Sequence, residues 1–287
     1  MRKIKQDFFD VLLLKKSWDI FSIIATIISL ILAFTGSIED SNKWLTGIII
    51  SISFIFIFSL IYIGEYIYNK FFVKRINVRI GKAFLVVKSG DLFEEEGLKV
   101  IPVNEYFDTQ VDNNIISENT LHGIFVKRYI ENNNENLKKL NTEISKQLKN
   151  VKYDEVKERK SGKKKRYPIA TTILIDDYIL TALSKFNDKN EAYLSMPEYL
   201  EFLNKFWNEI DRIHNGRIIN IPVIGTGLAR INPTLSYEEY LEQIIFSLKT
   251  SSITVGETKI NIIISEKKLS ECSLAKLKSI VSTINNK

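Results

Sequence analysis

Cysteine and histidine are scarce in this sequence of 287 residues. Cys272 is the single cysteine, so the chain can form no internal disulfide and cannot build a metal cage from thiolates. The two histidines are His122 and His214. This scarcity argues against a zinc hydrolase and against any site that needs several histidines. We therefore expect no metal site.

Charged residues are missing from two long stretches near the N-terminus, Ile20–Ile38 and Trp44–Gly64, of 19 and 21 residues. At about 1.5 Å of rise per residue, each stretch as a helix spans roughly 28 to 32 Å, which matches the hydrocarbon core of a bilayer. Buried core helices are the alternative, but these usually carry polar residues along one face. The two stretches therefore predict transmembrane helices, at about 20–38 and 44–64.

The short link 39–43 is too small for a domain, so the two spans are expected to form a hairpin. Basic residues flank both outer ends of the hairpin, whereas its tip holds Lys43 alone. Because cytoplasmic flanks are rich in lysine and arginine, both termini should be cytoplasmic. A secretory signal peptide is the rival for residues 1–38, but the apolar run begins late and a second span follows at once. We therefore expect a two-span protein of the cell membrane, in contact with lipid.

The net charge of +6 is concentrated in one stretch. Lys146–Arg166 holds ten basic and three acidic residues, Met1–Arg75 has a net charge of +3, and the remainder is about −4. A phosphate-contacting patch for nucleic acid is one interpretation. The stretch lacks interleaved aromatic residues for base stacking. We therefore favour a solvated surface connection near anionic lipid headgroups and expect no nucleic-acid partner.

The residues after about 75 alternate between strand-like and helical patterns. Nearly continuous apolar runs such as Ile218–Ile224 are typical of central strands that are covered on both faces. This order predicts an α/β domain over 76–287, with α/β/α layers and a largely parallel or mixed sheet, after an N-terminal part over 1–75. Strands are expected at 76–80, 83–88, 98–103, 169–176, 178–183, 218–224 and 259–265, and helices at 121–130, 135–149, 197–213, 237–250 and 274–285.

Three predicted strands end in residues that suit a ligand, and open α/β sheets bind ligands at the carboxyl ends of their strands. The first ends in Gly90-Asp91-Leu92. The Asp91 carboxylate can accept hydrogen bonds from an exocyclic amine such as that of adenine, although a turn or cap is the commoner role of such an Asp. The second delivers Asn104, whose amide can contact a ribose hydroxyl. The third opens into Gly225-Thr226-Gly227-Leu228, where glycines let backbone N–H groups approach a phosphate.

The order of these motifs resembles the macro domain, a module that binds ADP-ribose, over roughly residues 76–287. The resemblance implies that Asp91 and Leu92 meet adenine, that Asn104 lies near the distal ribose, and that Gly225, Thr226, Gly227 and Leu228 hold the diphosphate. Catalytic macro domains carry a glycine clamp for the distal ribose, and Glu105-Tyr106-Phe107-Asp108 stand in the corresponding segment here. We therefore expect a non-enzymatic protein without catalytic residues; a membrane-anchored ADP-ribosyl hydrolase is the alternative.

Three further motifs accompany the two predicted spans: Ser-x-Asn-Thr-Leu-His-Gly at 117–123, Lys-Arg-Tyr-Pro-Ile at 165–169 and Ile-Gly-Thr-Gly-Leu-Ala-Arg at 224–230. Together they resemble the membrane–macro form of ThsA, the effector family of Thoeris antiphage defence. The resemblance implies that a TIR-domain partner enzyme consumes NAD and makes an ADP-ribose-derived second messenger, which is histidine-ADP-ribose in this branch. It also implies that the macro domain binds the messenger and that the membrane part damages the host membrane, aborting infection.

Four more residues are candidate ligand contacts within these motifs: Thr120, His122, Gly123 and Arg230. The alternative for His122 is a structural role. The alternative for Arg230 is exposure to solvent without a ligand contact. A ligand can drive a change only by binding one state better than another. Because the short hairpin link allows the helices little independent motion, we expect signalling through association of subunits in a homo-oligomer. No cofactor is expected beside the nucleotide ligand.

Overall fold

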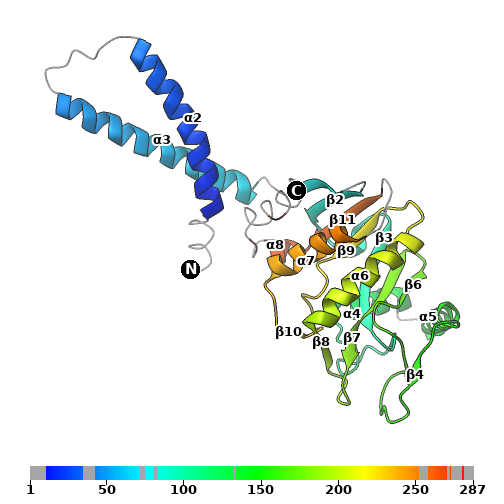
Figure 1. Ribbon diagram of the computed structural model, residues 1–287. Coiled ribbons are helices and arrows are strands. Elements are labelled where there is room, and N and C mark those ends of the chain that lie inside the picture. Colours follow the sequence, from blue (N-terminus) through cyan, green and yellow to red (C-terminus); the bar gives the residue numbers. More distant parts are fainter. Residues whose placement is uncertain are drawn as a thin grey trace. The chain divides into compact units, whose positions relative to one another are not determined.

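The computed structural model describes residues 11–34, 43–71, 75–80, 83–131, 134–251, 258–269, 272 and 280 (Figure 1). The chain divides into two compact units, Met1–Lys74 with Glu271–Ser279 and Arg75–Ser270 with Ile280–Lys287. The first unit holds the predicted membrane hairpin, and the second holds the predicted α/β domain.

Two long helices make up the described core of the first unit, α2 (Val11–Phe34) and α3 (Lys43–Phe71). They run antiparallel, because Lys16 of α2 pairs with Glu65 near the far end of α3, with 2.6 Å between Nζ and Oε2. The Phe21 ring lies edge-on to the rings of Phe54 and Phe58, with centroids 5.9 and 5.5 Å away. This is the antiparallel arrangement that the sequence predicts for the hairpin.

Apolar side chains on both helices face outward. At least half of the residue surface is exposed for Ile23, Ile27, Leu30, Ile48, Ile52, Ile55 and Phe56. An apolar surface of this kind needs a membrane or a partner to cover it. Among the described residues one segment, Gly47–Tyr68, is long and apolar enough to cross a bilayer. The other span, expected at 20–38, stays a prediction, since residues 35–38 lie outside the described residues.

A mixed sheet forms the centre of the second unit, and nine of the described strands belong to it. Its order is β1-β2-β11-β9-β3-β7-β8-β10, with β6 also paired to β7. The strands β2, β11, β9, β3 and β7 run parallel to one another, whereas β1, β6 and β8 make antiparallel pairs at the sides. The bounds are β1 Arg75–Ile80, β2 Ala83–Ser89, β3 Leu98–Asn104, β6 Thr172–Ile175, β7 Tyr178–Phe186, β8 Ala192–Ser195, β9 Ile219–Pro222, β10 Ile231–Asn232 and β11 Lys259–Ile264.

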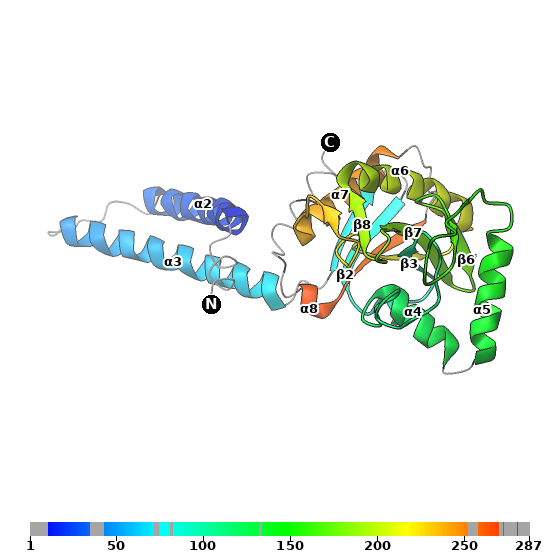
Figure 2. The same ribbon diagram turned by 90° about the horizontal axis from the view of Figure 1, so that it is seen from below.

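Helices cover both faces of this sheet (Figure 2). Helices α4 (Leu121–Ile130) and α5 (Asn134–Gln147) lie on one face, and α6 (Met196–Ile213) and α7 (Tyr237–Thr250) lie on the other. Shorter elements connect them: the 3₁₀ turn η1 (Leu92–Glu94), the hairpin of β4 (Asp154–Glu155) and β5 (Lys165–Arg166), and α8 (Glu266–Leu269). The prediction of α/β/α layers around a mixed sheet is confirmed.

Helix α6 shows how local sequence positions a layer. Ser195 and Glu198 form a capping box at its start. Pro197 occupies the first turn, where a backbone N–H would have no intrahelical acceptor, so the N–H that proline lacks is not missed. Its buried face packs on the sheet and carries Tyr199, Phe202, Leu203, Phe206, Trp207 and Ile210. Trp207 Nε1 donates to Ser247 Oγ of α7 at 2.9 Å, so the two helices of this layer are also joined by a buried hydrogen bond.

The predicted bounds agree with α4 and α7 and deviate by a few residues for most other elements. The strand expected at 169–176 is wrong over its first three residues, because Ala170 adopts a positive φ of 71° in a turn and β6 begins at Thr172. The short strands β4, β5, β8 and β10 were not predicted, since two to four residues carry too little alternation to detect. The helix expected at 274–285 lies almost wholly outside the described residues.

Candidate functional site

The topology brings the three predicted strand ends to one edge of the sheet. Strands β2, β11, β9 and β3 are parallel neighbours in that order, so the segments after them emerge on the same side. Asp91 follows β2, the loop Gly225–Leu228 follows β9, and Asn104 ends β3. The glycine loop therefore lies between Asp91 and Asn104 in the order of the strands.

Asp91 is both a cap and an exposed carboxylate. Its Oδ1 accepts a hydrogen bond from the Phe93 N–H at 2.9 Å and so starts η1. Its Oδ2 lies 3.6 Å from the guanidinium of Arg128, and about half of the side chain is exposed. The neighbouring Leu92 is buried in the core that packs under α4 and α5, so its side chain serves packing. A ligand can reach the Asp91 carboxylate from solvent.

Asn104 is nearly fully buried, and the oxygen and the nitrogen of its side-chain amide have different surroundings. Its Oδ1 accepts hydrogen bonds from the N–H groups of Tyr106 and Asp108, at 3.1 and 3.3 Å. Its Nδ2 is buried and has no partner among the described residues. An unpaired buried N–H₂ group is costly. Asn104 therefore offers a hydrogen-bond donor at the end of β3.

The two glycines of the loop after β9 have different surroundings. Gly225 has φ +100°, and a Cβ there would lie 2.9 to 3.0 Å from Ile231 and Tyr240. No heavy atom lies within 4 Å of a Cβ added at Gly227, so that side of the loop is open. The Tyr199 hydroxyl donates to the Ile224 carbonyl at 2.7 Å and anchors the start of the loop, while burial raises the pKa of Tyr199.

The other loop residues take varied positions. Thr226 Oγ1 donates to the Val223 carbonyl at 2.8 Å, and Leu228 is 58% exposed. Arg230 is exposed and pairs with Glu191 at 3.3 Å. A phosphate contact by Arg230 stays a prediction, and the structure gives this side chain an acidic partner on the surface instead.

The segment 117–123 forms the start of α4. Thr120 caps the helix by accepting from the Gly123 N–H at 3.0 Å and donating to the Ser117 carbonyl at 2.7 Å. A Cβ at Gly123 would lie 2.3 Å from the Ser117 oxygen, so glycine is required there. His122 is buried, and its Nε2 lies 2.9 Å from the Asp108 carbonyl. These contacts give Thr120, His122 and Gly123 structural roles at the start of α4. Contacts of these three residues with a ligand stay a prediction.

Burial lowers the pKa of His122 to about 4. The ring is therefore neutral near pH 7, and Nε2–H donates to the carbonyl of Asp108. His122 thus helps to hold the segment that follows Asn104.

A buried ion pair fixes the same segment, and the sequence reasoning missed it. Arg159 Nη2 and Nη1 lie 2.8 and 3.2 Å from the two carboxylate oxygens of Asp108, and both side chains are at least nine-tenths buried. The Lys163 N–H also donates to Asp108, and its ammonium donates to the Phe107 carbonyl at 2.6 Å. The guanidinium of Arg159 stacks on the Tyr106 ring, 3.7 Å from the centroid.

This pair corrects the interpretation of the basic stretch 146–166. A solvated connection is wrong for Arg159, which is a buried structural residue. The sequence offered two signals for this pair, the acidic Asp108 shortly after Asn104 and the long basic run. Asp108 and Arg159 are 51 positions apart, so no local pattern links them.

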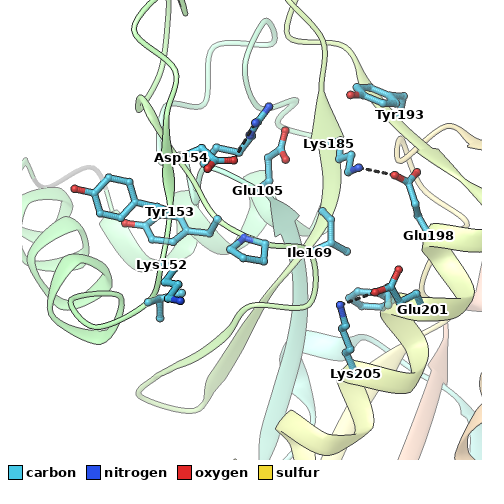
Figure 3. Close-up of a pocket in the computed structure, with 15 residues that line it drawn as sticks. Glu105, Lys152, Tyr153, Asp154, Ile169, Lys185, Tyr193, Glu198, Glu201 and Lys205 are labelled. Atoms are coloured by element: carbon cyan, nitrogen blue, oxygen red, sulfur yellow. Dashed lines mark hydrogen bonds and ion pairs between the residues drawn. The ribbon is translucent and has the colours of Figure 1, made fainter.

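A second feature that the sequence did not reveal is a cavity of about 830 Å³, which we call the Glu105 cavity (Figure 3). Segments from the ends of β3 and β7, from the basic stretch and from α6 surround it. Its lining residues are Glu105, Val151, Lys152, Tyr153, Asp154, Arg166, Tyr167, Pro168, Ile169, Lys185, Tyr193, Glu198, Glu201, Phe202 and Lys205.

Within the described part of the chain, no group of three or more histidine, cysteine, aspartate or glutamate side chains is placed to hold a metal ion. The chemistry at the sheet edge is therefore that of hydrogen-bond donors, carboxylates and an open glycine loop.

Comparison with known proteins shows the family of the chain. A family model described as "Thoeris protein ThsA, Macro domain" matches residues 85–265. The unit with the mixed sheet is thus a macro domain. A curated relative, the Thoeris protein ThsA of Bacillus amyloliquefaciens (strain Y2), is 31% identical over 212 residues, which are 72% of this chain and 71% of that protein. The chain belongs to the ThsA family of Thoeris proteins.

Solved macrodomain structures are also similar to the chain. The Oceanobacillus iheyensis macrodomain with ADP is 16% identical, with a TM-score of 0.48, over 73% of this chain and 97% of that one. The same macrodomain with MES bound is 16% identical, with a TM-score of 0.39, over 73% and 98%.

Proposed function

We propose that this protein is an antiphage defence effector whose macro domain senses an ADP-ribose-derived nucleotide. A TIR-domain partner enzyme would make the signal from NAD, and histidine-ADP-ribose is the signal that we propose. Binding changes the state of the membrane hairpin, and the hairpins of several subunits then disrupt the host membrane and abort infection. The protein acts at the cell membrane, with both termini in the cytoplasm and with no resident cofactor.

The order of the loops on the sheet edge carries the proposal. Neighbouring strands lie about 4.8 Å apart, so the ends of β2 and β3 are separated by roughly 14 Å across β11 and β9. Along that line stand a carboxylate for an exocyclic amine, an open glycine loop for a diphosphate and a free amide N–H₂ for a ribose. An extended nucleotide that ends in a second ribose presents complementary groups in the same order.

The segment after Asn104 supports binding rather than hydrolysis. The Asn104 Oδ1 is occupied by two backbone N–H groups, and Asp108 is held by Arg159 and Lys163. Hydrolysis needs a group that positions water against the distal ribose, and these side chains are committed to the fold. We propose that the ligand is held and not cleaved.

Titration calorimetry of the full chain in lipid nanodiscs tests the proposal with ADP-ribose, NAD and histidine-ADP-ribose as probes. We expect binding of histidine-ADP-ribose without cleavage, checked by chromatography of the recovered ligand. Asp91→Ala should weaken binding at least about tenfold, because it removes a charged hydrogen-bond acceptor.

Glu94→Gln is the matched control, since Glu94 pairs with the same Arg128 but is 71% exposed and is the last residue of η1. It should bind like the wild type. Failure of the wild type to bind any of the three probes, or full affinity in Asp91→Ala, would contradict the site. Ligand-dependent dye release from liposomes that contain the chain tests the membrane step.

A further inference from the structure

The side chain of Tyr199, on the buried face of α6, reaches the start of the glycine loop that follows β9. Tyr199 is fully buried, and its hydroxyl donates to the Ile224 carbonyl at 2.7 Å. Neighbouring rings fix its position, because it stacks on Phe202 and lies edge-on to Tyr240, with centroids 6.4 and 5.5 Å away. The Ile224 carbonyl is therefore held toward α6.

The Ile224 carbonyl belongs to the same peptide group as the Gly225 N–H. This peptide is trans. In a planar trans peptide the C=O and N–H bonds point in opposite directions. A carbonyl that points toward Tyr199 therefore turns the Gly225 N–H away from α6. The hydroxyl of Tyr199 thus sets the direction of the first N–H of the loop.

The backbone N–H groups of this loop are available to a ligand. Among the described residues, none of the N–H groups of Gly225, Thr226, Gly227 and Leu228 donates to a protein acceptor. Gly225 is nevertheless a buried residue. A buried N–H without an acceptor is costly, and an oxygen of an anion would remove that cost. Successive N–H groups in a turn form a nest of this kind for an anion.

We propose that Tyr199 is a positioning residue for the diphosphate of the nucleotide: its hydroxyl sets the plane of the Ile224–Gly225 peptide and so aims the Gly225 N–H at a phosphate oxygen. The inference rests on the proposed function, in which the glycine loop holds the diphosphate. Because Tyr199 is buried, it acts through the loop and does not contact the ligand. It lies 25 positions before Ile224, so no pattern within the loop reveals it.

Tyr199→Phe removes this hydroxyl and keeps the ring. Without the hydrogen bond, the peptide can rotate and the Gly225 N–H loses its fixed direction. Calorimetry on the full chain in lipid nanodiscs should show histidine-ADP-ribose bound about tenfold more weakly, the effect of one lost hydrogen bond to a charged group. The affinity for adenosine, which has no phosphate and is measured by displacement of histidine-ADP-ribose, should stay within about twofold.

Tyr240→Phe is the matched control, because it removes the hydroxyl of the tyrosine that lies edge-on to Tyr199 and also keeps the ring. Tyr199, and not Tyr240, donates to the Ile224 carbonyl, so Tyr240→Phe should bind both ligands like the wild type. The melting temperature of each variant reports folding.

Hydrogen–deuterium exchange of the wild type, read by mass spectrometry with electron-transfer fragmentation, is a second test that depends on no variant. Histidine-ADP-ribose should slow exchange of the Gly225 amide, whereas saturating adenosine should not. The inference is overturned, and the proposed function stands, if Tyr199→Phe binds histidine-ADP-ribose like the wild type or loses affinity equally for both ligands. An unprotected Gly225 amide in the histidine-ADP-ribose complex has the same consequence. Failure of the wild type to bind histidine-ADP-ribose would overturn both.

Discussion

At the scale of single residues, the loop after β9 combines a glycine at a backbone angle that only glycine adopts readily with an unhindered glycine. Gly225 has a positive φ and close neighbours, whereas Gly227 faces open space. We expect Gly227→Glu to abolish nucleotide binding with an unchanged melting temperature, because the new carboxylate would occupy the diphosphate position and repel it. Gly225→Ala should destabilise the fold by at least about 1–2 kcal/mol, the cost of a left-handed backbone for an L-residue.

Thermal unfolding and calorimetry of the two variants, side by side, separate these effects. The assignment of the glycine loop fails if Gly227→Glu binds histidine-ADP-ribose like the wild type. The account of Gly225 fails if Gly225→Ala melts at the temperature of the wild type.

Burial of His122 makes the free energy of unfolding depend on pH. The folded pKa is about 4, against an ordinary value of 6.5, mainly because of burial and further because of Lys163, while Asp108 acts in the opposite direction. Between these two values the unfolded chain binds a proton that the folded chain does not. The free energy of unfolding therefore falls as the pH drops from about 6.5 to about 4, by at most about 1.4 kcal/mol per pH unit.

His122→Gln should remove much of this slope, since glutamine does not titrate and keeps an N–H for the Asp108 carbonyl. Urea unfolding of both proteins at a series of pH values from 4.5 to 7 measures it. Parallel stability curves for the wild type and His122→Gln would show that the slope arises elsewhere.

At the scale of elements, the buried pair Asp108–Arg159 joins the end of β3 to the basic stretch. Arg159→Ala leaves the Asp108 carboxylate buried without its partner, which costs about 3–5 kcal/mol. Arg166→Ala is the control in the same stretch, because its pair with Asp154 is exposed at both ends and should contribute less than about 1 kcal/mol. Chemical unfolding of the two variants gives the comparison, and similar losses in both would contradict a structural role for Arg159.

Helix-scale features followed well from sequence because their signals are local. The helices expected at 121–130, 197–213 and 237–250 match α4, α6 and α7 to within one residue. The capping boxes at Ser195 and Ser236, which the structure adds, also lie within single turns of chain. The start of β6 was misjudged because a turn at Ala170 interrupts an apolar run without a glycine or a second proline to mark it. The edge strands β8 and β10 depend on pairing with each other and with β7, which local patterns do not encode.

At the scale of the whole molecule, the predicted hairpin assigns its tip and the chain termini to opposite sides of a membrane. In a Cys272→Ser background, a cysteine introduced by Ser41→Cys should react with an impermeant maleimide added to right-side-out vesicles. A cysteine introduced by Lys3→Cys should react only after the vesicles are opened, since both termini are expected on the cytoplasmic side. Mass spectrometry reads the modification, and labelling of both positions in sealed vesicles would contradict the two-span arrangement.

Features that depend on neighbours along the chain could be predicted from the amino-acid sequence alone. These are the uncharged runs, the alternation of strands and helices, and the residues Asp91, Asn104 and Gly225 at strand ends, because turn and strand chemistry is local. Only the tertiary structure placed Asp108 against Arg159 and enclosed Glu105 in a cavity. Both arrangements join segments that are far apart in sequence, and burial there changes the energy of a charge by an amount that no local pattern records.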